Sequence, residues 1–361
     1  MKPHVVSVLQ CLRTRLFASW SSSLATLAIL YLGWRIIPPL VEWAVVHAVW
    51  SPSNASLCRD AIGHGACWAF VADRYRFFLF GTFPSDQHWR PALTIGILIG
   101  LYLLSARPRL RPFHVIFFWL TGLAAIGVLM WGGVFGLSYV ENQRWGGLTL
   151  TLLLATFGIG FAFPLSIFLA LGRRSDMPVI RWLSITYIEL IRGVPLISVL
   201  FMASVMLPFF LPTGVSIDKL LRAQIAMIIF AAAYLAEVVR GGLQAIPHQQ
   251  EEAAQALGHN YWQRTWFVVL PQALRIAIPP LVNTFIGFFK DTSLVVIIGL
   301  FDFLTTIKVS LTEPSWTGFG VEAYLFAACG YFLFCYSMSR YSRELERQAA
   351  PGLRIGMVRE N

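Results

Sequence analysis

Few charged side chains occur within the apolar stretches of this chain, and those few decide which chemistry is open to it. Lys290 and Asp291 lie about midway along an apolar run and are followed by Thr292 and Ser293. Adjacent residues on a helix point about 100° apart, so Lys290 and Asp291 cannot pair directly with each other. Charges in such a run by default suggest function. Two roles stay open: a polar wall of a translocation path, or an interhelical ion pair that orders the helices.

Uncharged polar residues flank this charged pair. Asn283 and Thr284 lie one to two turns earlier on the same run. Hydroxyl groups can bond back to their own helix, so Thr292 and Ser293 alone say little about a ligand. The candidate residues for a substrate path are Asn283, Thr284, Lys290, Asp291, Thr292 and Ser293.

Two acid–base pairs repeat one spacing. Glu237 precedes Arg240 by three residues, and Glu189 precedes Arg192 by the same interval. Side chains three apart share a helix face, so an ion pair within each helix is expected. We interpret both pairs as structural clamps, with a gating role as the alternative.

Catalytic and metal-binding patterns do not occur in the sequence. There is no Gly-rich loop ending in Gly-Lys-Ser/Thr, and HQQEE, which ends at Glu252, is not HExxH. No cysteines or histidines have the spacing of zinc ligands. We therefore predict no catalytic residue, metal or cofactor on this chain, which argues against a membrane enzyme. Energy for transport must come from another chain or from an ion gradient.

The elements that position these residues follow from composition. Of 361 residues, 57% are hydrophobic and 13% charged, a balance typical of a polytopic membrane protein. A hydrocarbon core about 30 Å thick needs about 20 apolar residues per helix. No cleavable signal precedes the first span. We predict an all-α membrane protein with about eight transmembrane helices, at 23–48, 91–105, 113–137, 145–172, 189–211, 221–243, 278–300 and 318–340.

The basic residues are distributed unevenly between the two sides. If every span crosses and the N-terminus is cytoplasmic, most Arg and Lys residues fall on the cytoplasmic side. This agrees with the positive-inside rule and places both termini in the cytoplasm. The net charge is +10, but the Arg residues are spread over many loops. We therefore expect no nucleic-acid binding.

One long loop, at about 50–90, falls on the outer side. It contains Cys58 and Cys67, with Gly63 and Gly65 between them. In an oxidising compartment these cysteines can form a disulfide that closes a small loop. Two free thiols are the alternative of equal weight.

A polar segment of about twenty residues separates two apolar runs between Glu252 and Pro271. Its first half is rich in Ala, Glu, Gln and Leu, which favour helix. Gly258 is a stop signal, and an aromatic-rich half then ends at Pro271. The pattern predicts a helix–turn–helix on the water side of the membrane, a shape suited to docking a partner. An ordinary amphipathic loop is the alternative.

This segment resembles the EAA loop of ABC-transporter permease subunits. The matching residues are Glu252, Ala253, Ala254, Gly258, Leu270 and Pro271, while Val268 stands where the family often has Ile. The stretches IRGVPLISVLF, AYLAEVVRGGLQAIP and NTFIGFFKDTSLVVIIGL also resemble amino-acid permeases of this family. The amino-acid sequence of these stretches is most similar to that of the AapM-like subunits of general L-amino-acid importers, within the HisM-type permeases.

The resemblance implies an architecture for the whole chain. Residues 1–140 correspond to a three-helix N-terminal extension, 141–345 to the five-helix permease core of a type I importer, and 346–361 to a cytoplasmic tail. Residues 247–277, called here the coupling loop, would dock on the ATPase. The location implied is the bacterial inner membrane.

The resemblance also implies partners. These are a cytoplasmic ABC ATPase dimer that binds ATP and Mg, a periplasmic substrate-binding protein, membrane lipid, an L-amino-acid substrate and a second related permease that forms a heterodimer. Many family members have Asn-Glu where this chain has Asn283 and Thr284. The uncharged Thr284 fits a broad or acidic and amide preference, or a chain with no occupied site of its own. An ion-coupled secondary amino-acid transporter is the alternative function.

Overall fold

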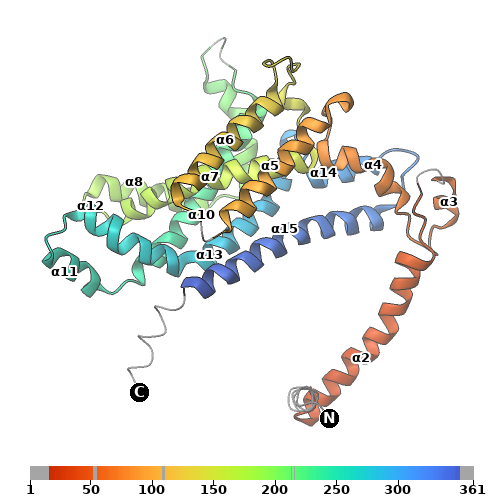
Figure 1. Ribbon diagram of the computed structural model, residues 1–361, viewed down its shortest axis with the longest axis horizontal. Coiled ribbons are helices and arrows are strands. Elements are labelled where there is room, and N and C mark those ends of the chain that lie inside the picture. Colours follow the sequence, from red (N-terminus) through yellow and green to blue (C-terminus); the bar gives the residue numbers. More distant parts are fainter. Residues whose placement is uncertain (1–15, 52–54, 108–109, 213, 215, 350–361) are drawn as a thin grey trace. The chain divides into compact units, whose positions relative to one another are not determined.

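The computed structural model describes residues 16–51, 55–107, 110–212, 214 and 216–349 (Figure 1). These residues form helices joined by turns, with two isolated β-bridges. Six helices are long and apolar enough to cross a membrane, and a bent pair can make a seventh. Each of the eight predicted spans contains helix, so the all-α membrane fold is confirmed, although α5 (Trp89–Ser105) is short for a span.

Contacts divide the chain into two compact units. One comprises the residues up to Arg74 together with Pro314–Ala323, and the other comprises Tyr75–Glu313 and the chain from Tyr324 onward. The predicted boundaries near residues 140 and 345 follow the family resemblance instead of contacts, and they stay predictions.

The smaller unit combines an exposed apolar helix with a disulfide-linked cap. Helix α2 (Trp20–Val41) starts at a capping box formed by Ser19 and Ser22, and it continues as the π-helix η1 (Glu42–Val46). None of the residues of α2 or η1 is buried.

Cys58 and Cys67 form a disulfide in the cap, with 5.4 Å between their Cα atoms. The backbone N–H of Cys67 donates to Glu322 over 3.0 Å. Gly65 is needed beside it, because a Cβ at this position would lie 2.0 Å from the carbonyl oxygen of His47.

Three helices form the centre of the larger unit. They are α7 (Gly147–Arg173), α10 (Lys219–Gln244) and α13 (Leu270–Asp291). Small residues let them approach closely, as membrane helices often do. A Cβ on Gly242 of α10 would lie 2.5 Å from the Ala273 carbonyl oxygen of α13. The shared core includes Leu150, Leu154, Met227, Leu235, Val239, Ala277 and Leu281.

The predicted span 189–211 is corrected by the structure. Helix α8 (Pro178–Arg192) ends at Gly193, and a second helical stretch bent by 101° starts at Leu196. Pro195 supplies the break, because its missing N–H and fixed φ suit the residue before a new helix. The second stretch comprises α9 (Leu196–Phe201), η5 (Met202–Met206) and η6 (Leu207–Phe210).

The predicted span 278–300 also differs from the helix observed. Helix α13 starts earlier, at Leu270, and changes after Asp291 into the 3-10 helix η8 (Thr292–Ile298). Gly299 then ends η8 in the left-handed region, with φ +72. The charged pair of the sequence therefore lies at the end of α13 instead of the middle of one straight helix.

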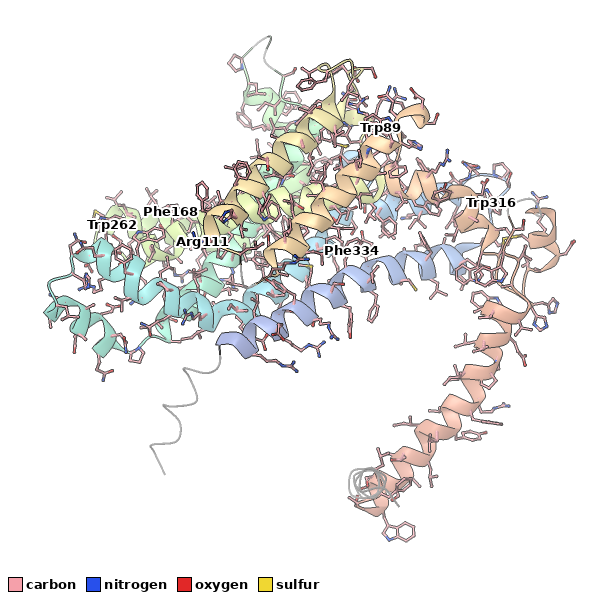
Figure 2. The ribbon with its side chains drawn as sticks, in the orientation of Figure 1. Trp89, Arg111, Phe168, Trp262, Trp316 and Phe334 are labelled. Atoms are coloured by element: carbon pink, nitrogen blue, oxygen red, sulfur yellow. A yellow bond between two sulfur atoms is a disulfide. The ribbon has the colours of Figure 1, made fainter. Side chains whose placement is uncertain are left out.

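Helices α6 (Pro112–Trp131) and α15 (Gly320–Ala349) are two further candidate spans, and the shorter α5 packs against α6. Phe289 of α13 packs against Tyr331 and Phe334 of α15, with ring centroids 5.6 and 5.5 Å apart. Figure 2 labels Phe334 on α15. Outside the coupling loop, the remaining helical elements of the described residues are α3 (Ala55–Asp60), α4 (Ala69–Phe80), η3 (Ser85–Gln87), η4 (Asn142–Arg144) and α14 (Phe303–Ser310).

Asp302 caps α14, and its carboxylate accepts hydrogen bonds from the backbone N–H groups of Leu304 and Thr305. Burial raises the pKa of Asp302, while these hydrogen bonds oppose the shift. This N-cap lies beside the start of α7, where the Phe303 N–H donates to the Thr151 hydroxyl over 3.0 Å.

Candidate functional site

The first half of the coupling loop is a short polar helix. Helix α11 (His248–Ala256) begins after Pro247, which fits the fixed φ of proline at a helix start. It stops at Leu257, and Gly258 follows with φ +82. Left-handed backbone of this kind strains residues with a Cβ, which explains the glycine. The predicted turn therefore needs glycine for its backbone conformation and not for space, since no atom lies within 4 Å of a Cβ at Gly258.

The second half joins the following span without a break. Asn260 and Gln263 form a capping box at the start of α12 (Tyr261–Gln263). The π-helix η7 (Arg264–Val269) follows and leads directly into α13. As the sequence predicted, Pro271 marks the start of the next element. It occupies the first turn of α13, and the wider π turns precede it.

The coupling loop has one buried and one exposed face. Helix α11 packs against η7, and Ala254, Thr265, Val269 and Leu270 are buried. Glu252 and Ala253 are exposed. Several large apolar side chains of this polar segment are also exposed. The most exposed are Leu257 at 80%, Phe267 at 73% and Trp262 at 59% (Figure 2).

Polar contacts tie the coupling loop to the helix bundle. Arg174, just past the end of α7, lies 3.2 Å from the Glu251 carboxylate. Its guanidinium also donates to the Leu243 carbonyl oxygen at the end of α10, over 3.2 Å. Across the turn, Arg264 donates to Gln255 over 3.2 Å. One guanidinium group therefore connects α11 to the ends of α7 and α10.

A second charged cluster lies at the same end of the bundle. Glu237 of α10 bonds Arg240 through two guanidinium nitrogens, and it lies 3.4 Å from Arg173 of α7 and 4.0 Å from Arg192 of α8. Arg173 also pairs with Glu189 of α8, over 2.8 Å. Three guanidinium groups thus surround two carboxylates and join three helices.

One of the two predicted clamps is corrected by this cluster. Glu237 and Arg240 pair as expected, but Glu189 pairs with Arg173 and Arg192 approaches Glu237. Helix α8 ends at Arg192, where the neighbouring ends of α7 and α10 offer partners in better positions. The sequence did not indicate the pair of Arg173 and Glu189, because these residues are sixteen positions apart. Arg173 was predicted only as one of the basic residues on the cytoplasmic side.

The candidate residues for the substrate path are divided between α13 and η8. Asn283 and Lys290 are exposed, and Gly287 between them has open space at its Cβ position. Buried Leu281 and Phe288 face the core. The exposed residues follow helical spacing, so they form a polar strip along α13.

The hydroxyl groups near this strip bond to their own chain. Thr284, Thr292 and Ser293 donate to the carbonyl oxygens of Pro280, Phe289 and Lys290, over 2.9, 2.8 and 2.8 Å. Thr292 is also buried. Asp291 is half-buried, and neither it nor Lys290 forms a salt bridge within the described part of the chain. The interhelical ion pair considered from the sequence is therefore absent there.

Comparisons with known proteins extend over nearly the whole chain. A family described as "Binding-protein-dependent transport system inner membrane component" matches residues 162–350. The chain is 49% identical over 348 residues to the inner membrane amino-acid ABC transporter permease protein YhdY of Escherichia coli strain K12, covering 94% of this chain and 92% of that protein.

Two further similarities are informative. The chain is 37% identical over 409 residues to the glutamate/glutamine/aspartate/asparagine transport system permease protein BztC of Rhodobacter capsulatus, covering 95% of this chain and 94% of that protein. A crystal structure of an amino acid ABC transporter with histidines matches with a TM-score of 0.50 and 31% identity, over 56% of this chain and 92% of that chain. The family match starts within α7 and includes the whole coupling loop.

Proposed function

The chain belongs to the family of binding-protein-dependent transport system inner membrane components, and from this premise we propose that it moves L-amino acids across the bacterial inner membrane by alternating access. The energy comes from ATP and Mg bound by a separate cytoplasmic ATPase. Ion-coupled transport, the alternative considered from the sequence, is not favoured, because the relatives are ABC transporter permeases.

The coupling loop is the proposed contact with the ATPase. The observation that carries this role is the exposure of Leu257, Trp262 and Phe267 on a segment that the Arg174–Glu251 ion pair holds to the helix bundle. A partner that covers these side chains gains the burial of apolar surface, at roughly 25 cal/mol per Å². Glu252 and Ala253 lie exposed on the same loop, while Ala254 keeps α11 packed on η7.

The charged cluster around Glu237 is the proposed pivot of the movement. It links α7, α8 and α10 at the end nearest the coupling loop. The bend between α8 and α9 at Gly193 and Pro195 supports a relative displacement of these helices.

The strip on α13 is the proposed substrate path. Asn283 and Lys290 supply an amide and an ammonium group, both of which bind carboxylates. The proposed partner of the substrate ammonium group is Asp291, the residue before η8. The uncharged Thr284 and the similarity to a glutamate/glutamine/aspartate/asparagine permease support a broad or acidic and amide preference.

The complete transporter needs further chains. We propose an ATPase dimer, a periplasmic binding protein and a second related permease that forms a heterodimer with this chain. The exposed apolar side chains of α8 and η6, such as Trp182 and Phe209, support burial against another membrane subunit or lipid.

Gly258 provides the test of coupling. Gly258→Val puts a β-branched residue at φ +82, where left-handed backbone costs about 1–2 kcal/mol even for residues without β-branching. We expect amino-acid uptake and the stimulation of ATPase activity by the binding protein both to fall severalfold. The measurement uses proteoliposomes that contain the complete transporter.

Gly258→Asn is the matched control, because Asn tolerates left-handed backbone. It should retain most of the uptake. Uptake that is unchanged in Gly258→Val, with the complex intact, would contradict the coupling role. Uptake that proceeds without any ATPase subunit would support the ion-coupled alternative.

A further inference from the structure

A basic cavity lies between the end of α5 and the last turns of α15. Its volume is about 640 Å³, and its lining includes Ala106, Tyr336, Arg340, Arg343 and Arg347. The residues from α15 recur at intervals of three and four, so they form one helix face. This cavity is separate from the coupling loop and from the strip on α13, and neither transport nor coupling as described above uses it.

The cavity has an excess of positive charge. Its one carboxylate, Glu344, lies 3.9 Å from Arg347, and both side chains are largely exposed. Arg340 and Arg343 form no salt bridge with any described residue. Two guanidinium groups therefore remain available for an anion, and guanidinium groups bind phosphate oxygens in a two-pronged geometry.

The depth of the cavity in the membrane follows from the sequence of α15. Seventeen uncharged residues separate Glu322 from Arg340, a length of about 26 Å at the helical rise of 1.5 Å per residue. That length is close to a hydrocarbon core about 30 Å thick, so Arg340 lies where the core ends. Tyr336 and Tyr341 line the cavity on either side of this level, and tyrosine favours the headgroup region.

The surface next to the cavity is apolar on the membrane side. Phe332 and Leu333 precede Tyr336 by about one turn and are 67% and 63% exposed. Arg107 follows α5, and Figure 2 labels Arg111 at the start of α6. Helix α15 thus changes from apolar at Phe332 and Leu333 to basic at Arg340 and Arg343, at the membrane boundary.

We propose that this cavity binds the phosphate of an anionic phospholipid headgroup. Arg340 and Arg343 bind the phosphate oxygens, Tyr336 lies at the level of the glycerol, and the acyl chains cover Phe332 and Leu333. An inorganic phosphate ion would leave those apolar side chains uncovered. A soluble protein partner would not reach Tyr336, which lies at the edge of the hydrocarbon region.

Native mass spectrometry of the complete transporter tests this site. The complex is equilibrated with mixed micelles that contain equal amounts of phosphatidylglycerol and phosphatidylethanolamine. We expect wild type to retain phosphatidylglycerol preferentially. Arg340→Gln/Arg343→Gln should lower the ratio of the two bound lipids roughly twenty-fivefold, since each basic residue near an anionic surface contributes about fivefold.

Three controls keep the result specific. Arg181→Gln removes an exposed charge at the start of α8, away from the cavity, and should leave the ratio unchanged. Arg340→Lys/Arg343→Lys keeps the charge and should retain most of the preference. The single variant Arg340→Gln, expected to lower the ratio about fivefold, covers the case in which the double variant does not assemble.

Other outcomes would overturn the proposal. An equal lipid ratio in wild type and Arg340→Gln/Arg343→Gln would exclude a role for these residues in lipid binding. Displacement of phosphatidylglycerol by excess inorganic phosphate would identify a site for free phosphate. Loss of the ATPase subunit from the double variant, with phosphatidylglycerol still bound, would identify a protein-docking surface.

Discussion

Arg174 is the residue on which three segments of the chain meet. Its side chain pairs with Glu251 of α11 and donates to the Leu243 carbonyl oxygen, while its backbone N–H ends α7 by bonding to Leu171. The two partners of the ion pair are about a third exposed, so its contribution to stability is at most about 1 kcal/mol. Its importance is therefore expected in coupling more than in folding.

A charge exchange separates these two roles. Arg174→Glu places two carboxylates together and should reduce uptake severalfold, as should Glu251→Arg. The double variant Arg174→Glu/Glu251→Arg restores an ion pair and should regain a large part of the uptake. The coupling energy is read from a double-mutant cycle on uptake in proteoliposomes. Additive losses in the double variant would count against the pair.

At the scale of elements, the approach of α10 to α13 decides how these helices can move. Gly242 is in the last turn of α10, and a Cβ there would lie 2.5 Å from the Ala273 carbonyl oxygen and 3.0 Å from the Ala277 Cβ. The neighbouring Gly241 has no atom within 4 Å of a Cβ. Two adjacent glycines therefore serve different purposes, since only Gly242 permits the close approach of two backbones.

Alanine at each position measures this difference. Gly242→Ala must push α13 away and should destabilise the protein by about 1–3 kcal/mol, the usual cost of overpacking. Gly241→Ala should be neutral or stabilise it by up to about 1 kcal/mol, because alanine favours helix. Thermal unfolding of the purified transporter compares the two variants. Shifts of the same sign and size would contradict the packing seen between α10 and α13.

At the scale of the whole molecule, the direction in which the chain is inserted into the membrane decides which side the coupling loop faces. The carboxyl end of α7 and the coupling loop lie at one end of the helix bundle, and the start of α7 and the Asp302 cap lie at the other (Figure 1). The distribution of the basic residues predicts that the coupling loop is cytoplasmic, where an ATPase can reach it. The orientation itself is a prediction.

Two exposed residues test the orientation. Leu257 of the coupling loop is 80% exposed, and Tyr139, in the turn between α6 and α7, is 63% exposed. A membrane-impermeant maleimide should label Leu257→Cys only in inside-out vesicles and Tyr139→Cys only in right-side-out vesicles. The unsubstituted chain gives the background from its native cysteines. Labelling of both variants from the same side would contradict the predicted topology.

The sequence by itself determined the class of fold and the place of the coupling loop. Uninterrupted apolar runs of about 20 residues fold as helices in lipid, because a helix bonds every backbone polar group within its own segment. Gly258 and the Ala-rich stretch before it are local signals, and local backbone preferences suffice to predict a helix and its stop. The polarity of that stretch, which lies between two apolar runs, is a further local signal, and it predicted a docking segment.

Only the tertiary structure decided how charges pair and where helices bend. Glu189 and Arg192 share a helix face, yet each finds its partner on another helix, because helix ends that meet in space offer positions that sequence spacing does not contain. The basic cavity beside α15 likewise depends on where the end of α5 lies. The distance between two helix ends is a property of packing, which depends on side chains far apart in the chain.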